Sequence, residues 1–121
     1  MITTLVIGAS ENPQRYSYLA VKRLLKYQHA VNAIGLKTGR IDSVTIDTGF
    51  PDYKNIHTIT LYINPSRQPA YYDYILSLHP KRVIFNPGTE NPEFEILLVK
   101  NNIEAVEACT LVMLSTNQYE R

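Results

Sequence analysis

The chain has 121 residues, a formal net charge of +1 and a single cysteine. Its length is typical of one domain that buries about two thirds of its unfolded surface, so we expect residues 1–121 to form a single domain. The near-zero charge gives no reason to expect nucleic acid or an anionic membrane as a partner, and one cysteine excludes an intrachain disulfide framework. No segment resembles a signal peptide or reaches membrane-spanning length, so we expect a cytoplasmic protein.

The first predicted element is a strand over residues 2–7 that ends at Gly8. Leu5, Val6 and Ile7 are apolar without alternation, which is typical of a strand covered by helices on both faces. A helix is expected to start near Ser17, so backbone N–H groups and the positive end of its dipole would face an anion in the intervening loop. Candidate contacts in this loop are Ala9, Ser10, Asn12, Arg15 and Tyr16.

Strand-like and helix-like segments alternate along the rest of the chain. Further strands are predicted over residues 30–34, 44–46, 59–63, 83–85 and 103–107, and helices over residues 18–26, 69–78 and 93–101. Such alternation implies right-handed crossovers between parallel strands. We therefore predict an α/β fold with helices on both faces of a central parallel sheet of about five strands, in an order like 3-2-1-4-5, with Gly8 at its centre.

In open sheets of this kind, ligands bind outside the carboxyl ends of the strands. We expect three loops to meet there, with a fourth, Gly35-Leu36-Lys37, at the edge. The three loops are Gly8-Ala9-Ser10, Asn64-Pro65-Ser66 and Asn86-Pro87-Gly88.

Each loop also has an explanation without a ligand. The first has one glycine where the dinucleotide motif has three, so it could be a tight turn with a serine N-cap. Proline and asparagine end many strands through turn chemistry alone. The repetition of such loops at the same end of successive strands is what favours a binding site.

Lys37 and Arg40 follow the second strand, where a NAD-binding protein usually places an acidic residue. A cation there suits an additional phosphate on the ribose, as in coenzyme A or NADP, and disfavours plain NAD. The alternative for Lys37 is an ordinary solvated loop lysine.

Together these segments resemble the CoA-binding domain family, whose stand-alone members are similar to the nucleotide-binding domain of the succinyl-CoA synthetase α subunit. The resemblance spans nearly the whole chain and rests on Val6-Ile7-Gly8-Ala9-Ser10, Arg15-Tyr16-Ser17, Ile63-Asn64-Pro65, Phe85-Asn86-Pro87-Gly88 and the tail from Asn102 to Cys109. It implies a Rossmann-like three-layer sandwich that holds coenzyme A or acyl-CoA. Taken together, the residue patterns and the resemblance give these candidate cofactor contacts: Gly8, Ala9, Ser10, Asn12, Arg15, Tyr16, Ser17, Gly35, Lys37, Ile63, Asn64, Pro65, Asn86, Pro87 and Gly88.

The chain departs from this family in three respects. Relatives often have Asn-Pro where this chain has Gly35-Leu36, and an arginine where Ala108 precedes Cys109. The chain also lacks the further domain that carries the phosphohistidine of the synthetase. Cys109 is either a small buried hydrophobe or a thiol that forms a mixed disulfide with bound coenzyme A.

No catalytic constellation is visible in the sequence. The three histidines, His29, His57 and His79, are expected at the surface and away from the carboxyl ends of the strands, and no acid–base pair or metal-ligand spacing stands out. Non-catalytic binding of CoA or acyl-CoA is therefore the leading hypothesis. One alternative is an NADP-dependent reductase, which would need a proton donor that this sequence does not offer. The other is an interaction module that has lost its nucleotide. The sequence does not identify a protein partner.

Overall fold

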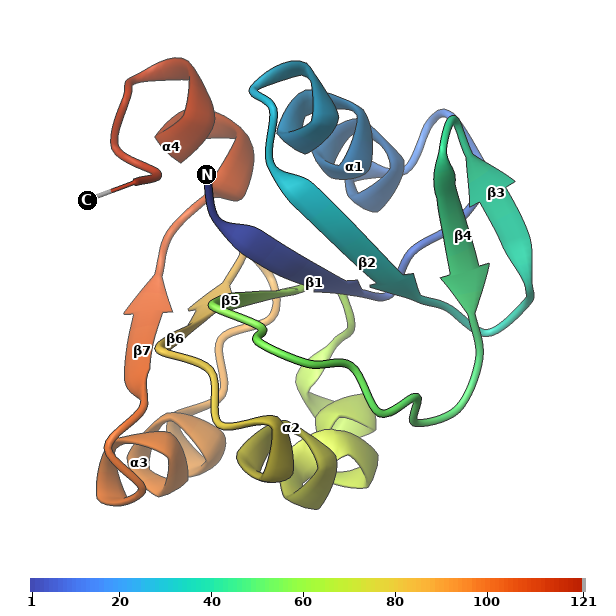
Figure 1. The fold of residues 1–121 in the computed structure, drawn as a ribbon. Helices are drawn as coiled ribbons and strands as arrows, with labels where there is room; N and C mark the ends of the chain where they lie inside the picture. The colour runs from blue at the N-terminus through green and yellow to red at the C-terminus, as the bar shows by residue number, and fades with distance from the viewer. Residues whose placement is uncertain (121) are drawn as a thin grey trace.

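The computed structural model describes residues 1–120 and shows a seven-stranded sheet between two layers of helices (Figure 1). The strands lie in the order β3-β4-β2-β1-β5-β6-β7. Their bounds are β1 Thr3–Ile7, β2 Ala30–Ile34, β3 Gly39–Ile41, β4 Val44–Asp47, β5 Thr58–Leu61, β6 Arg82–Phe85 and β7 Glu104–Glu107.

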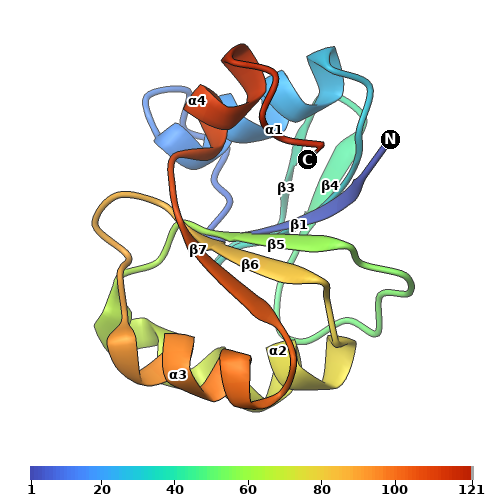
Figure 2. The same cartoon turned by 90° about the vertical axis from the view of Figure 1, so that its left-hand side faces the viewer.

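Helices cover both faces of the sheet, as Figure 2 shows. On one face lie α1 (Tyr16–Lys26) and α4 (Thr110–Ser115), and on the other lie the 3-10 helix η1 (Pro65–Tyr71), α2 (Tyr72–Leu78) and α3 (Pro92–Lys100). Because β1 is central and covered on both sides, its side chains alternate between two apolar layers. Leu5 and Ile7 belong to the layer with Phe94 of α3, whereas Val6 belongs to the layer with Leu24 of α1. This explains the unbroken apolar run in the sequence.

The predicted α/β class with a mostly parallel sheet is confirmed, but the number and order of the strands differ from the prediction. The sheet has seven strands, and β3 pairs antiparallel with β4 at one edge. Residues 39–41 follow the short loop that begins at Gly35, and they are too few to display a strand period, so this edge strand had no readable signal in the sequence.

Two helical segments also differ from the prediction. The helix predicted over residues 69–78 is divided, because η1 starts at Pro65 and α2 only at Tyr72. The short helix α4, directly after Cys109, was not predicted. The predicted helix start near Ser17 agrees with α1, which begins at Tyr16 and has Arg15, not a serine, at its N-cap.

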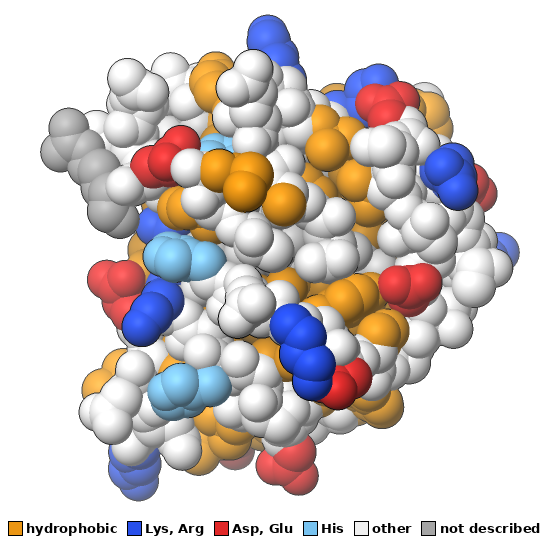
Figure 3. Space-filling view, in the orientation of Figure 1, with side chains coloured by type: hydrophobic (Ala, Val, Ile, Leu, Met, Phe, Trp, Pro, Cys, Tyr) orange, Lys and Arg blue, Asp and Glu red, His pale blue; other side chains and the backbone are white. Residues whose placement is uncertain are grey.

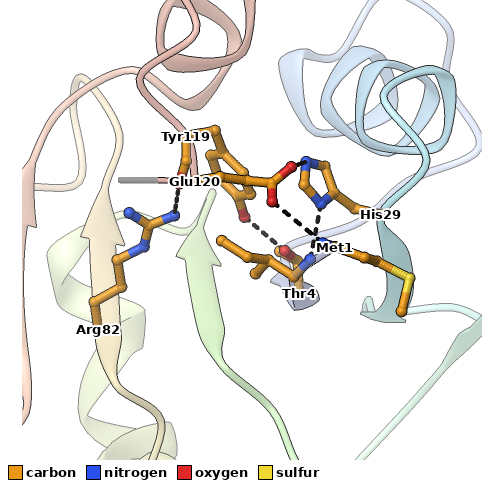
Figure 4. A network of polar contacts seen from close by, with 7 residues as sticks. Met1, Thr4, His29, Arg82, Tyr119 and Glu120 are labelled. Carbon is orange, nitrogen blue, oxygen red and sulfur yellow. Dashed lines mark hydrogen bonds and ion pairs between the residues drawn. The ribbon is translucent and has the colours of Figure 1, made fainter.

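The amino ends of the strands are covered by the segment after α4, and His29 is buried there instead of lying at the surface. Its side chain packs edge-on against Tyr119 with ring centroids 5.0 Å apart, and its Nδ1 accepts a hydrogen bond from the amide of Ile2 at 3.0 Å. Arg82 donates to Thr58 Oγ1. It also donates to the carbonyl of Tyr119, as Figure 4 shows. His29, which belongs to the first crossover, is therefore held between Ile2 and Tyr119, near the two ends of the chain. Local sequence does not reveal such a contact.

Candidate functional site

The carboxyl ends of the central strands enclose a cavity of about 690 Å³, a size typical of small-molecule sites. Its walls are the loops that follow β1, β2, β5 and β6. In Figure 2 the loops after β1 and β6 lie at the same end of the strands, although they lead to helices on opposite faces of the sheet. Most of the predicted contact residues line this cavity: Gly8, Ala9, Ser10, Asn12, Arg15, Tyr16, Ser17, Lys37, Ile63, Asn64, Pro87 and Gly88. The structure brings them together, and their role in binding stays a prediction.

Gly8 is required by a close approach of two loops. Its φ is +100°, and a Cβ at this position would lie 2.7 Å from the carbonyl oxygen of Tyr62. The amides of Gly8 and Ala9 both donate to the carbonyl of Ile34 at 2.9 Å. These two N–H groups therefore hold the loop against β2 and are not themselves directed at an anion in the cavity.

The first turn of α1 supplies the amides that are available to an anion. The N–H groups of Tyr16 and Ser17 open the helix and have no acceptor within residues 1–120. Both residues line the cavity, and so does Arg15 at the N-cap. The helix dipole adds a partial positive charge at the same place.

Gly35, Pro65 and Asn86 were predicted as contacts but do not line the cavity. A Cβ at Gly35 would lie 2.3 Å from the carbonyl oxygen of Ala9, so this glycine lets two loops pack together. Pro65 begins η1. Asn86 is buried, and its side chain is fully engaged within the fold.

The Asn86 side chain joins three elements. Its Nδ2 donates to Thr60 Oγ1 at 2.6 Å and to the carbonyl of Leu61 at 2.8 Å, and its Oδ1 accepts from the amide of Thr110 at 2.9 Å. These bonds connect β5, the end of β6 and the start of α4. Asn86 therefore shapes the site from behind, without presenting its amide to a ligand.

Six lining residues were not among the predicted contacts: Glu11, Leu36, Thr38, Tyr62, Arg67 and Thr89. Arg67 matters most, because it adds a third cation to Arg15 and Lys37. It lies in the first turn of η1. Because the helix was predicted to begin only at residue 69, Arg67 was not considered as a contact. A helix beginning at Pro65 was the available signal, since proline favours the first helical position.

The cations of the cavity face one carboxylate. Glu11 Oε2 accepts a hydrogen bond from the backbone amide of Arg40 at 2.9 Å, which ties the loop after β1 to β3. Arg15, Lys37 and Arg67 are all exposed, and none of them forms an ion pair with a described carboxylate. The cavity is therefore net positive and suited to an anionic ligand.

Side chains suited to acid–base chemistry are not gathered at the cavity. The histidine side chains, pale blue in Figure 3, lie on the face that shows the chain termini in Figure 1, and none of them lines the cavity. Burial raises the pKa of Tyr62 well above its usual range, so its phenol is neutral. Cys109 is half-buried at the N-cap of α4 and lies outside the cavity lining.

Residues 1–120 contain neither a metal-binding cluster nor a membrane-spanning helix. No group of three or more His, Cys, Asp or Glu side chains is arranged to hold a metal ion. None of the helices has both the length and the apolar composition needed to cross a membrane.

Comparison with known proteins gives the family of the chain. The sequence model of the CoA binding domain matches residues 3–115. The crystal structure of an uncharacterized protein with 50% sequence identity superposes with a TM-score of 0.96 over 98% of both chains. No match was found among curated proteins.

More distant structures share the fold. A protein from Thermus thermophilus has a TM-score of 0.86 at 21% identity, over 98% of this chain and 90% of its own. A dinucleotide-forming acetyl-coenzyme A synthetase from Ca. Korarchaeum cryptofilum, solved with phosphate and ADP, has a TM-score of 0.70 at 16% identity, over 88% of this chain and 25% of its own. Since the family match spans nearly the whole chain, this protein belongs to the CoA-binding domain family.

Proposed function

We propose that this protein binds coenzyme A or acyl-CoA in the cavity at the carboxyl ends of its strands, without catalysing a reaction. The observation that carries the proposal is the set of cations Arg15, Lys37 and Arg67, which line one cavity and have no carboxylate partner among the described residues.

The distribution of donors suits the phosphates of coenzyme A. Its diphosphate would lie at the amides of Tyr16 and Ser17, beside Arg15. Its 3′-phosphate would lie near Lys37, at the end of β2. NAD has no phosphate at that position, and the lysine stands where a NAD site usually has an acidic residue.

Support for a binding role without catalysis comes from the side chains that line the cavity. Its ionisable groups are two arginines, one lysine, two tyrosines and one glutamate. The buried Tyr62 phenol is neutral, Tyr16 is exposed, and the Glu11 carboxylate accepts a hydrogen bond from the backbone amide of Arg40. Such a set holds an anion but provides no poised general base. Binding alone would allow the protein to sense CoA or to deliver it to a partner.

Calorimetric titration with CoA, NADP and NAD tests the proposal, together with mass spectrometry of any ligand that copurifies. We expect CoA to bind more tightly than NAD. Equal or tighter binding of NAD would refute this choice of ligand, and preference for NADP would favour the reductase hypothesis. If no nucleotide binds, the chain is better described as an interaction module that kept the fold.

A further inference from the structure

One buried side chain joins the loops that follow β5 and β6. Gln68 lies in η1 and is 1% exposed. Its Nε2 donates to the carbonyl oxygen of Ile63 at 3.1 Å and to that of Thr89 at 2.7 Å. Because Ile63 and Thr89 both line the cavity, Gln68 ties two parts of its wall together from behind.

This connection begins where the sheet ends. The last paired residues of β5 and β6 are Leu61 and Phe85, so the backbone ladder does not extend to the loops beyond them. Both N–H groups of the Gln68 amide are used to bridge the loops, which sets the separation of two carbonyls that belong to different crossovers.

A second buried amide fixes the first. Asn91 is 7% exposed, and its Nδ2 donates to Gln68 Oε1 at 2.9 Å and to the Tyr72 hydroxyl at 2.8 Å. Asn91 is also the N-cap of α3, and its Oδ1 accepts a hydrogen bond from the amide of Phe94 at 3.2 Å. Each N–H and each carbonyl of the two side-chain amides thus has a partner, and such a completed buried network is rigid.

The position of these loops in the sheet indicates which part of the ligand they would meet. Lys37 follows β2, the Gly8 loop follows β1, and the loops joined by Gln68 follow β5 and β6, in that spatial order. A CoA molecule with its 3′-phosphate near Lys37 and its diphosphate beside β1 would direct its pantetheine arm over β5 and β6. We propose, resting on the CoA binding proposed above, that Gln68 is a positioning residue that shapes the wall for the pantetheine arm.

The variant Gln68→Met tests this inference, because methionine has a similar length but no hydrogen-bonding amide. It leaves the carbonyls of Ile63 and Thr89 unpaired within the wall. The control is Thr4→Val, which removes a buried hydrogen bond to the Tyr119 hydroxyl at the opposite end of the sheet. Asn91→Ser is a second, milder variant, since serine still caps α3 but cannot hold Gln68.

The first measurement compares the affinities for CoA and for adenosine 3′,5′-bisphosphate, which lacks the pantetheine arm. We expect Gln68→Met to weaken CoA by about tenfold, the effect of a lost buried hydrogen bond, while the bisphosphate changes by less than about twofold. Asn91→Ser should produce a smaller loss of the same kind, and Thr4→Val should leave both affinities unchanged. An equal loss for both ligands, or no loss for CoA, would overturn the inference.

The second measurement is hydrogen exchange of the unliganded protein, which does not depend on CoA. Amides of residues 62–64 and 88–91 should exchange faster in Gln68→Met than in the wild type, and they should be unaffected in Thr4→Val. Unchanged exchange in either loop would show that Gln68 does not hold it.

If the wild type binds no CoA, the proposed function fails, while the exchange data still decide whether Gln68 positions the loops. If Gln68→Met does not fold, the same measurements on Asn91→Ser decide the question.

Discussion

The exposed cations of the cavity contribute to the protein in a different way from its buried arginine. Arg82 is 5% exposed and its guanidinium is held by Thr58, by the carbonyl of Tyr119 and by the face of the Tyr119 ring, 4.7 Å away. Lys37 and Arg67 have no such contacts within the described chain, so their substitution should leave the fold almost unchanged. Changes at these two positions can therefore be interpreted as effects on binding.

Lys37→Ala should weaken CoA binding by about 1.5–3 kcal/mol, because it removes a charge-assisted hydrogen bond to phosphate. Dephospho-CoA, which lacks the 3′-phosphate, should bind the wild type less tightly than CoA does. For Lys37→Ala the two ligands should bind almost equally, as titration calorimetry can show. The matched control is Lys100→Ala in the last turn of α3, outside the cavity. Undiminished discrimination between the two ligands in Lys37→Ala would assign this lysine to solvent.

At the level of elements, the Glu11 side chain connects the loop after β1 to the hairpin of β3 and β4, where it packs against Gly39. A Cβ at Gly39 would lie 2.5 Å from Glu11 Cδ and 2.8 Å from Oε2. The same Oε2 accepts the hydrogen bond from the amide of Arg40. The absent side chain at Gly39 thus makes room for the contact that places the Lys37 loop next to the Gly8 loop.

Gly39→Ala should displace the Glu11 carboxylate and lower the free energy of unfolding by about 1 kcal/mol, the contribution of one hydrogen bond. In a Glu11→Ala background the carboxylate is already absent, so the same substitution should cause no further loss and can even stabilise the strand through the unfolded state. Chemical denaturation of the two single variants and the double variant gives the coupling energy. An equal loss in both backgrounds would mean that Gly39 is constrained by something other than Glu11.

At the scale of the whole molecule, the predictable features were those encoded by local patterns repeated along the chain. The apolar run ending at Gly8 indicated a buried central strand, and the loops at the strand ends did converge on one cavity. What escaped prediction depends on contacts between distant residues. Asn86 has the sequence signature of a binding residue, yet its amide bonds to Thr60 and Thr110 turn it inward. Local sequence cannot distinguish these two orientations.

The burial of His29 is the clearest example of such a long-range effect, and it has a consequence for the stability of the entire fold. Burial lowers the pKa of His29 below its ordinary value of 6.5; Glu120 opposes this effect, whereas the N-terminal ammonium and, more weakly, Arg82 add to it. The pKa of His57 is also lowered, first by burial and then by Arg82 and Lys81. Protonation of either ring would place a second positive charge near a buried guanidinium.

We therefore expect stability to fall as the pH decreases through the ordinary histidine range. A histidine with a lowered pKa in the folded state binds its proton more readily after unfolding, so its contribution is complete above about pH 6.5 and is lost as the pH falls below that value. Denaturation at a series of pH values between about 8 and 5.5 measures this slope. The double variant His29→Asn/His57→Asn should flatten the curve, because asparagine can still accept the hydrogen bond from Ile2 but does not titrate. His79→Asn, at an exposed left-handed position that asparagine tolerates, is the control and should retain the wild-type slope. A double variant as pH-sensitive as the wild type would place the acid-labile group elsewhere in the fold.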